Sequence, residues 1–466
     1  MQKLKKVLLR EETLIGAFVV LIVIIALTMA FYARNLSRNQ IGVSDQSCAH
    51  NQAGTLNSTN QTKTLSSNAP AKTLIIFAEA FPYYVVSKNL DYLPNVKALC
   101  NEGRCFSMQP QSPTFTTMEL YALQTGRKPY EAQYAYNFII NETAYRQNTC
   151  SFDGSFDDLG WPAQTNLLGE ISATHKFASY SFARADHQRY SEDLFPKIPD
   201  LLEKSDVVFT YITDTDSHYT NLTTTDSQSP LMAKFKLFDQ QLGILFQHLK
   251  ARGLYENTNI VLFGDHGMMK IEHFDYLPEL LGNASKNADL NDVCVWNDAG
   301  MSLRFWILSK AAEKKGSINK ALTDYFSSKS DCYEVVNDAV LRQYEMYFPN
   351  ATNRWINFGD VYIATKPGCK VNTQKPAGGM ENGFADVQSS VDKYISMHGY
   401  IDNNDPKLQA FVIARVGAAT EKPIIPENFT ARDLHGLIKD LVFGHKNLVR
   451  SEFNTTANTV RLPNDE

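Results

Sequence analysis

The chain has 466 residues, of which 44% are hydrophobic and 20% are charged. This composition is typical of a globular protein and excludes a wholly disordered or collagen-like chain. The 45 Lys and Arg residues against 50 Asp and Glu residues give a formal net charge of −5, so nucleic-acid binding is not expected as a main role. Only one segment of the sequence is long and apolar enough to cross a bilayer, which excludes a multi-span transporter.

Residues 14–33 form that apolar segment and carry no charge. At about 1.5 Å per residue, a helix of this length spans roughly the 30 Å of a hydrocarbon core. Lys and Arg are concentrated before the segment, which predicts a cytosolic tail over residues 1–13 and a type II signal anchor. The rest of the chain is then extracellular or lumenal, at the plasma membrane or a secretory-pathway membrane. A cleaved signal peptide is the alternative, although its apolar core is usually shorter.

Residues 34–71 are polar and predict a disordered stalk, and residues 451–466 predict a polar C-terminal tail. The chain has seven cysteines, which an oxidising compartment would largely pair. Because seven is odd and Cys48 stands alone in the stalk, Cys48 is expected either to link two chains into a disulfide-bonded homodimer or to remain a free thiol. N-x-[ST] sequons support the secretory route and a glycoprotein.

Residues 72–450 are expected to form one α/β domain. Four short apolar runs are typical of buried parallel strands, namely Leu74–Phe77, Val207–Ile212, Ile260–Phe263 and Phe411–Ala414. Apolar residues at helical spacing predict an amphipathic helix over Leu231–Leu249. The alternation of strands and helices predicts a central, mostly parallel sheet that is covered by helices on both faces.

Carboxylates and imidazoles stand next to these predicted strands. The candidates are Glu79, Asp214, His218, Asp265, His266 and His398. Each one alone is more often a turn, cap or surface residue, but functional residues of such sheets gather beyond the carboxyl ends of the strands. Asp, Glu and His without a thiolate suit zinc or a hard divalent ion, and the number of candidates favours two ions that share a phosphate or a water.

Five segments of the sequence form motifs in unbroken chain order. They are SPTFTTMELYALQTGRKP at 112–129, YITDTDSH at 211–218, NIVLFGDHGM at 259–268, HGYIDNNDPKLQAFVIARVGA at 398–418 and NFTARDLHGLIKDLV at 428–442. Together they closely resemble the ectonucleotide pyrophosphatase/phosphodiesterase family (type I phosphodiesterases) of the alkaline phosphatase superfamily. The resemblance implies an alkaline-phosphatase-like fold and metal-dependent hydrolysis of phosphodiester or pyrophosphate bonds in a small-molecule substrate, with nucleotide-type substrates as the first expectation.

The resemblance also implies a role for each candidate residue. Thr116, at the start of a helix, would be the nucleophile and form a phospho-threonine intermediate, and Asn137 would stabilise the oxyanion. Two divalent metal ions, zinc in particular, would be bound by separate sets of ligands. One set is Asp214, His218 and His398, and the other is Glu79, Thr116, Asp265 and His266.

Several positions depart from the family pattern, including Pro82 in place of a basic residue and Leu120 in place of a His. Glu79-Ala80 stands where the family has Asp-Gly, Thr117 replaces the aromatic residue of members that prefer nucleotides, and Glu119 replaces an Asn. These departures leave open a catalytically weak pseudoenzyme that binds a ligand at the cell surface, or a phospholipid-directed phosphodiesterase. A phosphoethanolamine transferase also stays possible, whereas the segment lacks the C-x-P-x-R or S-x-P-x-R motif of a sulfatase.

Overall fold

The computed structural model describes residues 71–128, 131, 138–154, 166–180, 190–216, 226–373, 395–417 and 425–444. None of the helices within these ranges combines the length and the apolar character that a membrane span requires. The predicted cytosolic tail, signal anchor and C-terminal tail lie outside the described residues, as does the stalk except for its last residue. The proposed domain bounds therefore stay predictions.

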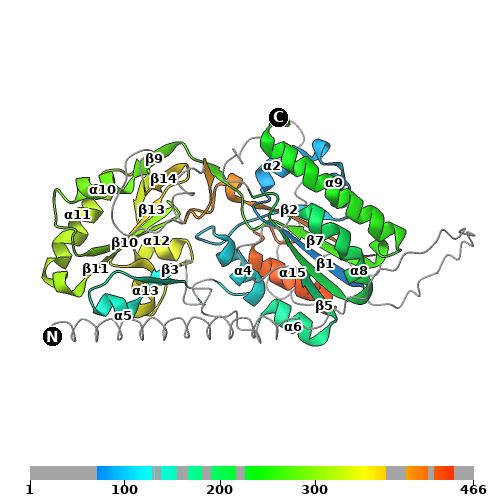
Figure 1. Ribbon diagram of the computed structural model, residues 1–466, viewed down its shortest axis with the longest axis horizontal. Coiled ribbons are helices and arrows are strands. Elements are labelled where there is room, and N and C mark those ends of the chain that lie inside the picture. Colours follow the sequence, from blue (N-terminus) through cyan, green and yellow to red (C-terminus); the bar gives the residue numbers. More distant parts are fainter. Residues whose placement is uncertain are drawn as a thin grey trace, which may run out of the picture. The chain divides into compact units, whose positions relative to one another are not determined.

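A six-stranded sheet lies at the centre of the described fold, in the order β2-β16-β7-β1-β6-β5 (Figure 1). Its strands are β1 (Lys72–Ala78), β2 (Arg104–Met108), β5 (Phe177–Tyr180), β6 (Val207–Ile212), β7 (Thr258–Phe263) and β16 (Ala410–Arg415). Strand β1 pairs in parallel with both β6 and β7, and β5 pairs in parallel with β6. The predicted mostly parallel α/β sheet is therefore confirmed.

The prediction that Phe411–Ala414 is a parallel strand is wrong. This run lies in β16, which pairs antiparallel with both β7 and β2. A buried strand presents the same apolar residues in either direction, so its sequence carries no sign of its orientation. The reversal has a useful consequence, because the segment that precedes β16 can approach the same sheet edge at which the parallel strands end.

Helices cover both faces of this sheet. Side chains of β1 alternate between two cores, with Leu74 and Ile76 on one face and Ile75 and Phe77 on the other. The first face packs against α2 (Tyr83–Lys88), α3 (Pro94–Glu102), α8 (Ile198–Lys204) and α9 (Pro230–Ala251). The second packs against α4 (Thr116–Thr125), α6 (Leu167–Thr174) and α15 (Ala431–Phe443), and Figure 1 shows α9 and α15 on opposite sides of the strands. Burial on both faces explains why β1 is a continuous apolar run.

Helix α9 contains the predicted amphipathic segment. It begins with Pro230 at the first helical position, and the Ser229 side chain accepts a hydrogen bond from the Met232 N–H at 3.2 Å. The expected apolar face is buried, from Leu231 to Leu249. The helix prediction is therefore confirmed, with ends one or two residues beyond the predicted ones.

A second, antiparallel sheet has the order β10-β11-β13-β12. Its strands are β10 (Val293–Asp298), β11 (Ser302–Ile307), β12 (Tyr333–Val335) and β13 (Val361–Thr365), which pack with α10 (Leu277–Ala284) and α11 (Lys315–Ser327). Strand pairs join β14 (Cys369–Asn372) to β9 (His273–Tyr276), β15 (Ser396–Met397) to β8 (Met269–Lys270), and β3 (Phe138–Ile140) to β4 (Phe152–Gly154). The remaining helices are α5 (Glu142–Arg146), α7 (Ser191–Leu194), α12 (Asp338–Gln343) and α13 (Ala351–Phe358).

Three disulfides join six of the seven cysteines. They are Cys100–Cys105, Cys150–Cys294 and Cys332–Cys369. The seventh, Cys48, lies outside the described residues, so the disulfide-linked homodimer stays a prediction. Stable disulfides are typical of proteins that fold in an oxidising compartment.

Removing the Cys150–Cys294 disulfide is expected to lower the free energy of unfolding far more than removing Cys100–Cys105. The first closes a loop with a sequence separation of 144 residues and the second one of 5. Loop-closure entropy predicts losses of about 5 and about 2 kcal/mol respectively. Urea unfolding of the two double Cys→Ser variants measures the difference, and equal losses would show that the entropy of the unfolded chain does not govern these bonds.

Candidate active site

Three parallel strands end side by side at one edge of the central sheet. Their register pairs Ala78 of β1 with Ile212 of β6, and Phe77 of β1 with Phe263 of β7. The residues that follow these strand ends, Glu79 after β1 and Asp265 after β7, therefore emerge next to one another. This is the sheet edge at which the sequence predicts the functional residues.

Thr116 is the first residue of α4, and its side chain reaches the groups at this edge. Its Oγ1 lies 3.4 Å from Oε1 of Glu79 and 3.2 Å from Nε2 of His266. The helix begins after Phe115, which caps it only through its extended backbone. Because the positive end of a helix dipole and its free N–H groups favour negative charge, the start of α4 suits an anionic group bound at Thr116.

Asp265 and His266 form a buried pair beside Thr116. Oδ1 of Asp265 accepts hydrogen bonds from the N–H groups of Ala80 (2.8 Å) and His266 (3.0 Å), and its Oδ2 lies 3.1 Å from His266 Nε2. Nδ1 of His266 donates to the carbonyl of Gly267 at 3.0 Å, which directs Nε2 toward Asp265 and Thr116. Burial lowers the pKa of His266, but the charge and hydrogen bond of Asp265 together with the charges of Asp216 and Glu79 outweigh it, so the net pKa is raised. The Asp265 carboxylate therefore favours the positively charged form of the His266 imidazole.

His398 joins this group from the segment before β16. Its imidazole stacks on that of His266, with ring centroids 3.7 Å apart and an interplanar angle of 16°. Its Nδ1 donates to the carbonyl of Thr114 at 2.8 Å, which leaves Nε2 as the nitrogen that can bind a metal. Both imidazoles are thus fixed by a backbone carbonyl through Nδ1, the arrangement that metal-binding histidines commonly have.

Glu79 is surrounded by other acidic groups. Burial, followed by the charges of Asp216 and Asp265, raises the pKa of Glu79 to about 8, although the Tyr211 hydroxyl donates a hydrogen bond to it. The carboxylates of buried Asp265 and of the partly buried Glu79 and Asp216 repel one another unless a cation or a proton compensates them. This excess of negative charge fits the binding of a cation.

Asp214 forms its hydrogen bonds with the first residue of α7. Both of its carboxylate oxygens accept the N–H of Ser191, at 3.0 and 2.9 Å, and one also accepts the Ser191 hydroxyl. Asp214 thus fixes the start of α7. The charge of Asp216, two residues later, instead contributes to raising the pKa of both Glu79 and His266. Sequence reasoning missed Asp216 and Tyr211, because the repeated Thr-Asp of TDTDSH does not indicate which aspartate faces the site.

Two departures from the family pattern have local structural effects. Ala80, where the family has Gly, adopts a positive φ of 50°, a conformation that costs a non-glycine residue about 1–2 kcal/mol. Its N–H bond to Asp265 stabilises this turn. Glu119 is buried one turn after Thr116 and accepts the N–H of Gln111, which ties the segment before Thr116 to α4. Burial raises the pKa of Glu119 well above its ordinary value.

The structure thus brings Glu79, Thr116, Asp265 and His266 into mutual contact, with His398 stacked on His266. Asn137 and His218 lie outside the described residues, and the predicted roles of all these residues stay predictions. Within the described ranges, no three His, Cys, Asp or Glu side chains converge closely enough to bind a metal ion. The donor chemistry still fits a divalent cation, because buried carboxylates face an imidazole nitrogen and a hydroxyl at 3.1–3.4 Å.

A sequence model of the family described as type I phosphodiesterase / nucleotide pyrophosphatase matches residues 144–401, more than half of the chain. No curated protein matches the sequence. Among solved structures, the chain is similar to murine ectonucleotide pyrophosphatase/phosphodiesterase 5, an inactive variant in complex with AMP. The TM-score is 0.57 and the identity 15%, with 80% of this chain and 95% of that chain covered. At this identity the likeness shows a shared fold.

Proposed function

The chain belongs to the type I phosphodiesterase / nucleotide pyrophosphatase family, and we propose that it hydrolyses phosphodiester or pyrophosphate bonds through a phospho-threonine intermediate on Thr116. The observation that carries this proposal is the position of the Thr116 hydroxyl. It lies at the amino terminus of a ten-residue helix, within 3.4 Å of both Glu79 and His266. A threonine oxygen so placed lies beside groups that can bind a cation and beside a site for anionic oxygens.

The proposed reaction has two balanced steps. Thr116 Oγ1 attacks phosphorus as its proton passes to solvent water, and the bond between phosphorus and the leaving oxygen breaks. The alcohol or nucleotide that leaves takes up a proton from solvent. Water then attacks the phospho-threonine, restores the hydroxyl and releases the phosphate product. Asn137, by resemblance, would donate a hydrogen bond to a phosphoryl oxygen in both steps.

Glu79, Thr116, Asp265 and His266 would hold one divalent cation, and Asp214, His218 and His398 a second, with zinc the first candidate. When bound, such cations supply the positive charge that lowers the pKa of the threonine hydroxyl and neutralises phosphoryl oxygens. The excess of buried carboxylates supports this assignment, as do the two imidazoles fixed through Nδ1. Asp216 is a further carboxylate near this group.

Nucleotide-type compounds are the substrates to test first. The similar mouse protein was solved with AMP, which supports this choice. Thr117 stands where nucleotide-preferring members of the family have an aromatic residue that stacks on the base. A phospholipid-directed activity is therefore the alternative, and a pseudoenzyme that only binds its ligand is the competing class.

We also infer a single-pass type II topology, with residues 14–33 as the anchor and the hydrolase domain extracellular or lumenal. The three disulfides support this topology, because such bonds persist mainly in oxidising compartments. Protease protection of the domain in sealed microsomes would test it.

Chelation is expected to abolish hydrolysis. Full-length protein in detergent should cleave a chromogenic thymidine phosphodiester, and excess chelator should lower kcat by about 10³-fold, since cation charge stabilisation contributes several kcal/mol to the transition state. Adding Zn²⁺ back should restore turnover. A diacyl phosphodiester substrate assayed in parallel separates the lipid alternative, and absence of any turnover on both substrates would contradict the hydrolase proposal and favour the pseudoenzyme.

A further inference from the structure

Thr114 makes an unusual number of contacts with one distant segment. It is completely buried, and it lies two residues before Thr116. Its carbonyl oxygen accepts His398 Nδ1 at 2.8 Å, and its hydroxyl oxygen accepts the N–H groups of Gly399 at 2.7 Å and Tyr400 at 3.1 Å. Its own N–H donates to the Tyr400 carbonyl at 3.0 Å. One residue therefore fixes the backbone of 398–400 and one ring nitrogen of His398.

The backbone at Gly399 shows how closely the two segments fit. Its φ is +96°, a conformation that L side chains rarely adopt, and a Cβ at this position would collide with the ring of Phe115. Phe115 caps α4 and also lies edge-on to the His398 ring, with centroids 5.7 Å apart. The segments 114–116 and 398–400 are therefore packed so tightly that neither can shift alone.

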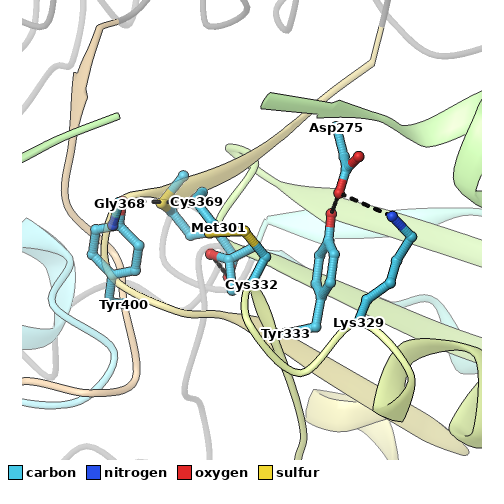
Figure 2. Close-up of a disulfide and its surroundings, with 9 residues drawn as sticks. Asp275, Met301, Lys329, Cys332, Tyr333, Gly368, Cys369 and Tyr400 are labelled. Carbon is cyan, nitrogen blue, oxygen red and sulfur yellow. Dashed lines mark hydrogen bonds and ion pairs between the residues drawn. A yellow bond between two sulfur atoms is a disulfide. The ribbon is translucent and has the colours of Figure 1, made fainter. Parts of the chain in front are cut away.

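Tyr400 connects the segment 398–400 to the Cys332–Cys369 disulfide, as Figure 2 shows. Its hydroxyl accepts the Gly368 N–H at 3.3 Å and lies 3.5 Å from the carbonyl of Cys369, which is bonded to Cys332. The ring is completely buried. Tyr400 thus joins the segment 398–400 to a loop that a covalent bond constrains.

We propose that Thr114 is a positioning residue that holds His398 at a fixed distance from the nucleophile Thr116, with the Tyr400 hydroxyl as its second anchor. The proposal rests on the proposed function, in which His398 and Thr116 contribute to different halves of one site. Without the Thr114 hydroxyl, the Tyr400 N–H loses its buried acceptor. The Gly399 N–H loses the nearer of its two acceptors and keeps only the Thr114 carbonyl at 3.1 Å, so we expect the segment to shift. A displacement on the order of 1 Å in such a site can lower the rate about 10²-fold.

The test compares Thr114→Val, which keeps the shape of the side chain, with Thr114→Ser, which keeps its hydroxyl, in the full-length protein. Thr114→Val is expected to lower kcat about 10²-fold with KM changed less than about 3-fold, and to weaken Zn²⁺ binding in competition with a chelating indicator. Thr114→Ser is expected to stay within about 5-fold of the unmodified protein in kcat and in Zn²⁺ affinity. A purely structural role would not produce rescue by the hydroxyl alone.

Thr365→Val is the matched control, because Thr365 is a buried threonine whose hydroxyl donates to the Met301 carbonyl at 2.8 Å in a different sheet. It should lower the melting temperature without changing kcat.

If the unmodified protein hydrolyses substrate and folded Thr114→Val has kcat within about 3-fold of it, the proposal is wrong. If the unmodified protein does not hydrolyse substrate, the proposed function fails. In that case, equal Zn²⁺ affinity of the unmodified protein and Thr114→Val also overturns the role of Thr114. Should Thr114→Val not fold, Tyr400→Phe replaces it, with a 3- to 10-fold loss of kcat expected and no loss overturning the proposal.

Discussion

Replacing Thr116 with alanine is expected to lower kcat by about 10⁴-fold or more, because the reaction then lacks the oxygen that attacks phosphorus. The substitution removes only a hydroxyl and one methyl group, and the alanine favours the first turn of α4. Folding should therefore be unaffected. Steady-state hydrolysis of a chromogenic phosphodiester measures kcat. Mass spectrometry of the acid-quenched unmodified protein should detect a phosphoryl group on the peptide that contains Thr116.

Thr125→Ala provides the matched control, since it makes the same chemical change at the other end of α4. The Thr125 hydroxyl donates to the Tyr121 carbonyl at 2.7 Å and contacts no predicted site residue in the described structure. It should leave kcat unchanged. Thr116→Ser should keep both turnover and the phosphorylated intermediate. Hydrolysis by Thr116→Ala at the unmodified rate would show that water, or another side chain, attacks phosphorus.

The sequence predicted the sheet well because its signals are local. A continuous apolar run such as that of β1 is typical of a strand buried on both faces, and the spacing in α9 is typical of a helix with one buried face. Strand direction is not a local property, and the orientation of β16 was predicted wrongly for that reason. The same limit applies to the second sheet, whose antiparallel pairs the sequence analysis did not predict.

The site was predicted where a motif fixes a residue at a strand end or a helix start. Glu79, Asp265 and Thr116 meet in the structure because β1 and β7 are neighbours and α4 begins above them. Which aspartate of the TDTDSH segment faces this group depends on the path of the loop after β6, which the spacing of residues does not encode. The contacts of Thr114 reach residues 284–286 positions away, so no local pattern indicates them.

Asp265→Asn is expected to separate catalysis from folding. The carboxylate uses Oδ1 for the N–H groups of Ala80 and His266, and an asparagine keeps that oxygen. Its amide nitrogen would take the position of Oδ2, which lies 3.1 Å from His266 Nε2, and could donate to this nitrogen while Nδ1 donates to Gly267. The variant therefore keeps the local hydrogen bonds but loses one negative charge beside Glu79.

Loss of that charge is expected to lower activity strongly and stability only slightly. The kcat should fall about 10³-fold, because a negatively charged ligand of the proposed cation is lost and the amide occupies the histidine nitrogen. In the presence of chelator, the free energy of unfolding should fall by no more than about 1 kcal/mol. Burial raises the pKa of Asp265, but the charge of His266 and several hydrogen bonds outweigh it, so the net pKa is lowered and the fold favours the charged carboxylate. Relief of the repulsion with Glu79 offsets part of the loss. Hydrolysis assays and urea unfolding of metal-free protein measure the two quantities.

Asp239 is the matched comparison, as a carboxylate of similar burial outside the site. Its Oδ1 accepts the N–H groups of Asn95 and Val96, at 3.0 and 2.7 Å, and its Oδ2 accepts Asn95 Nδ2 at 2.9 Å. In Asp239→Asn two amide nitrogens would face each other, which should cost about 1–3 kcal/mol of stability without changing kcat per folded molecule. If Asp265→Asn were instead the more destabilising of the two, the carboxylate of Asp265 would serve the fold, and the proposed cation site would lose its central ligand.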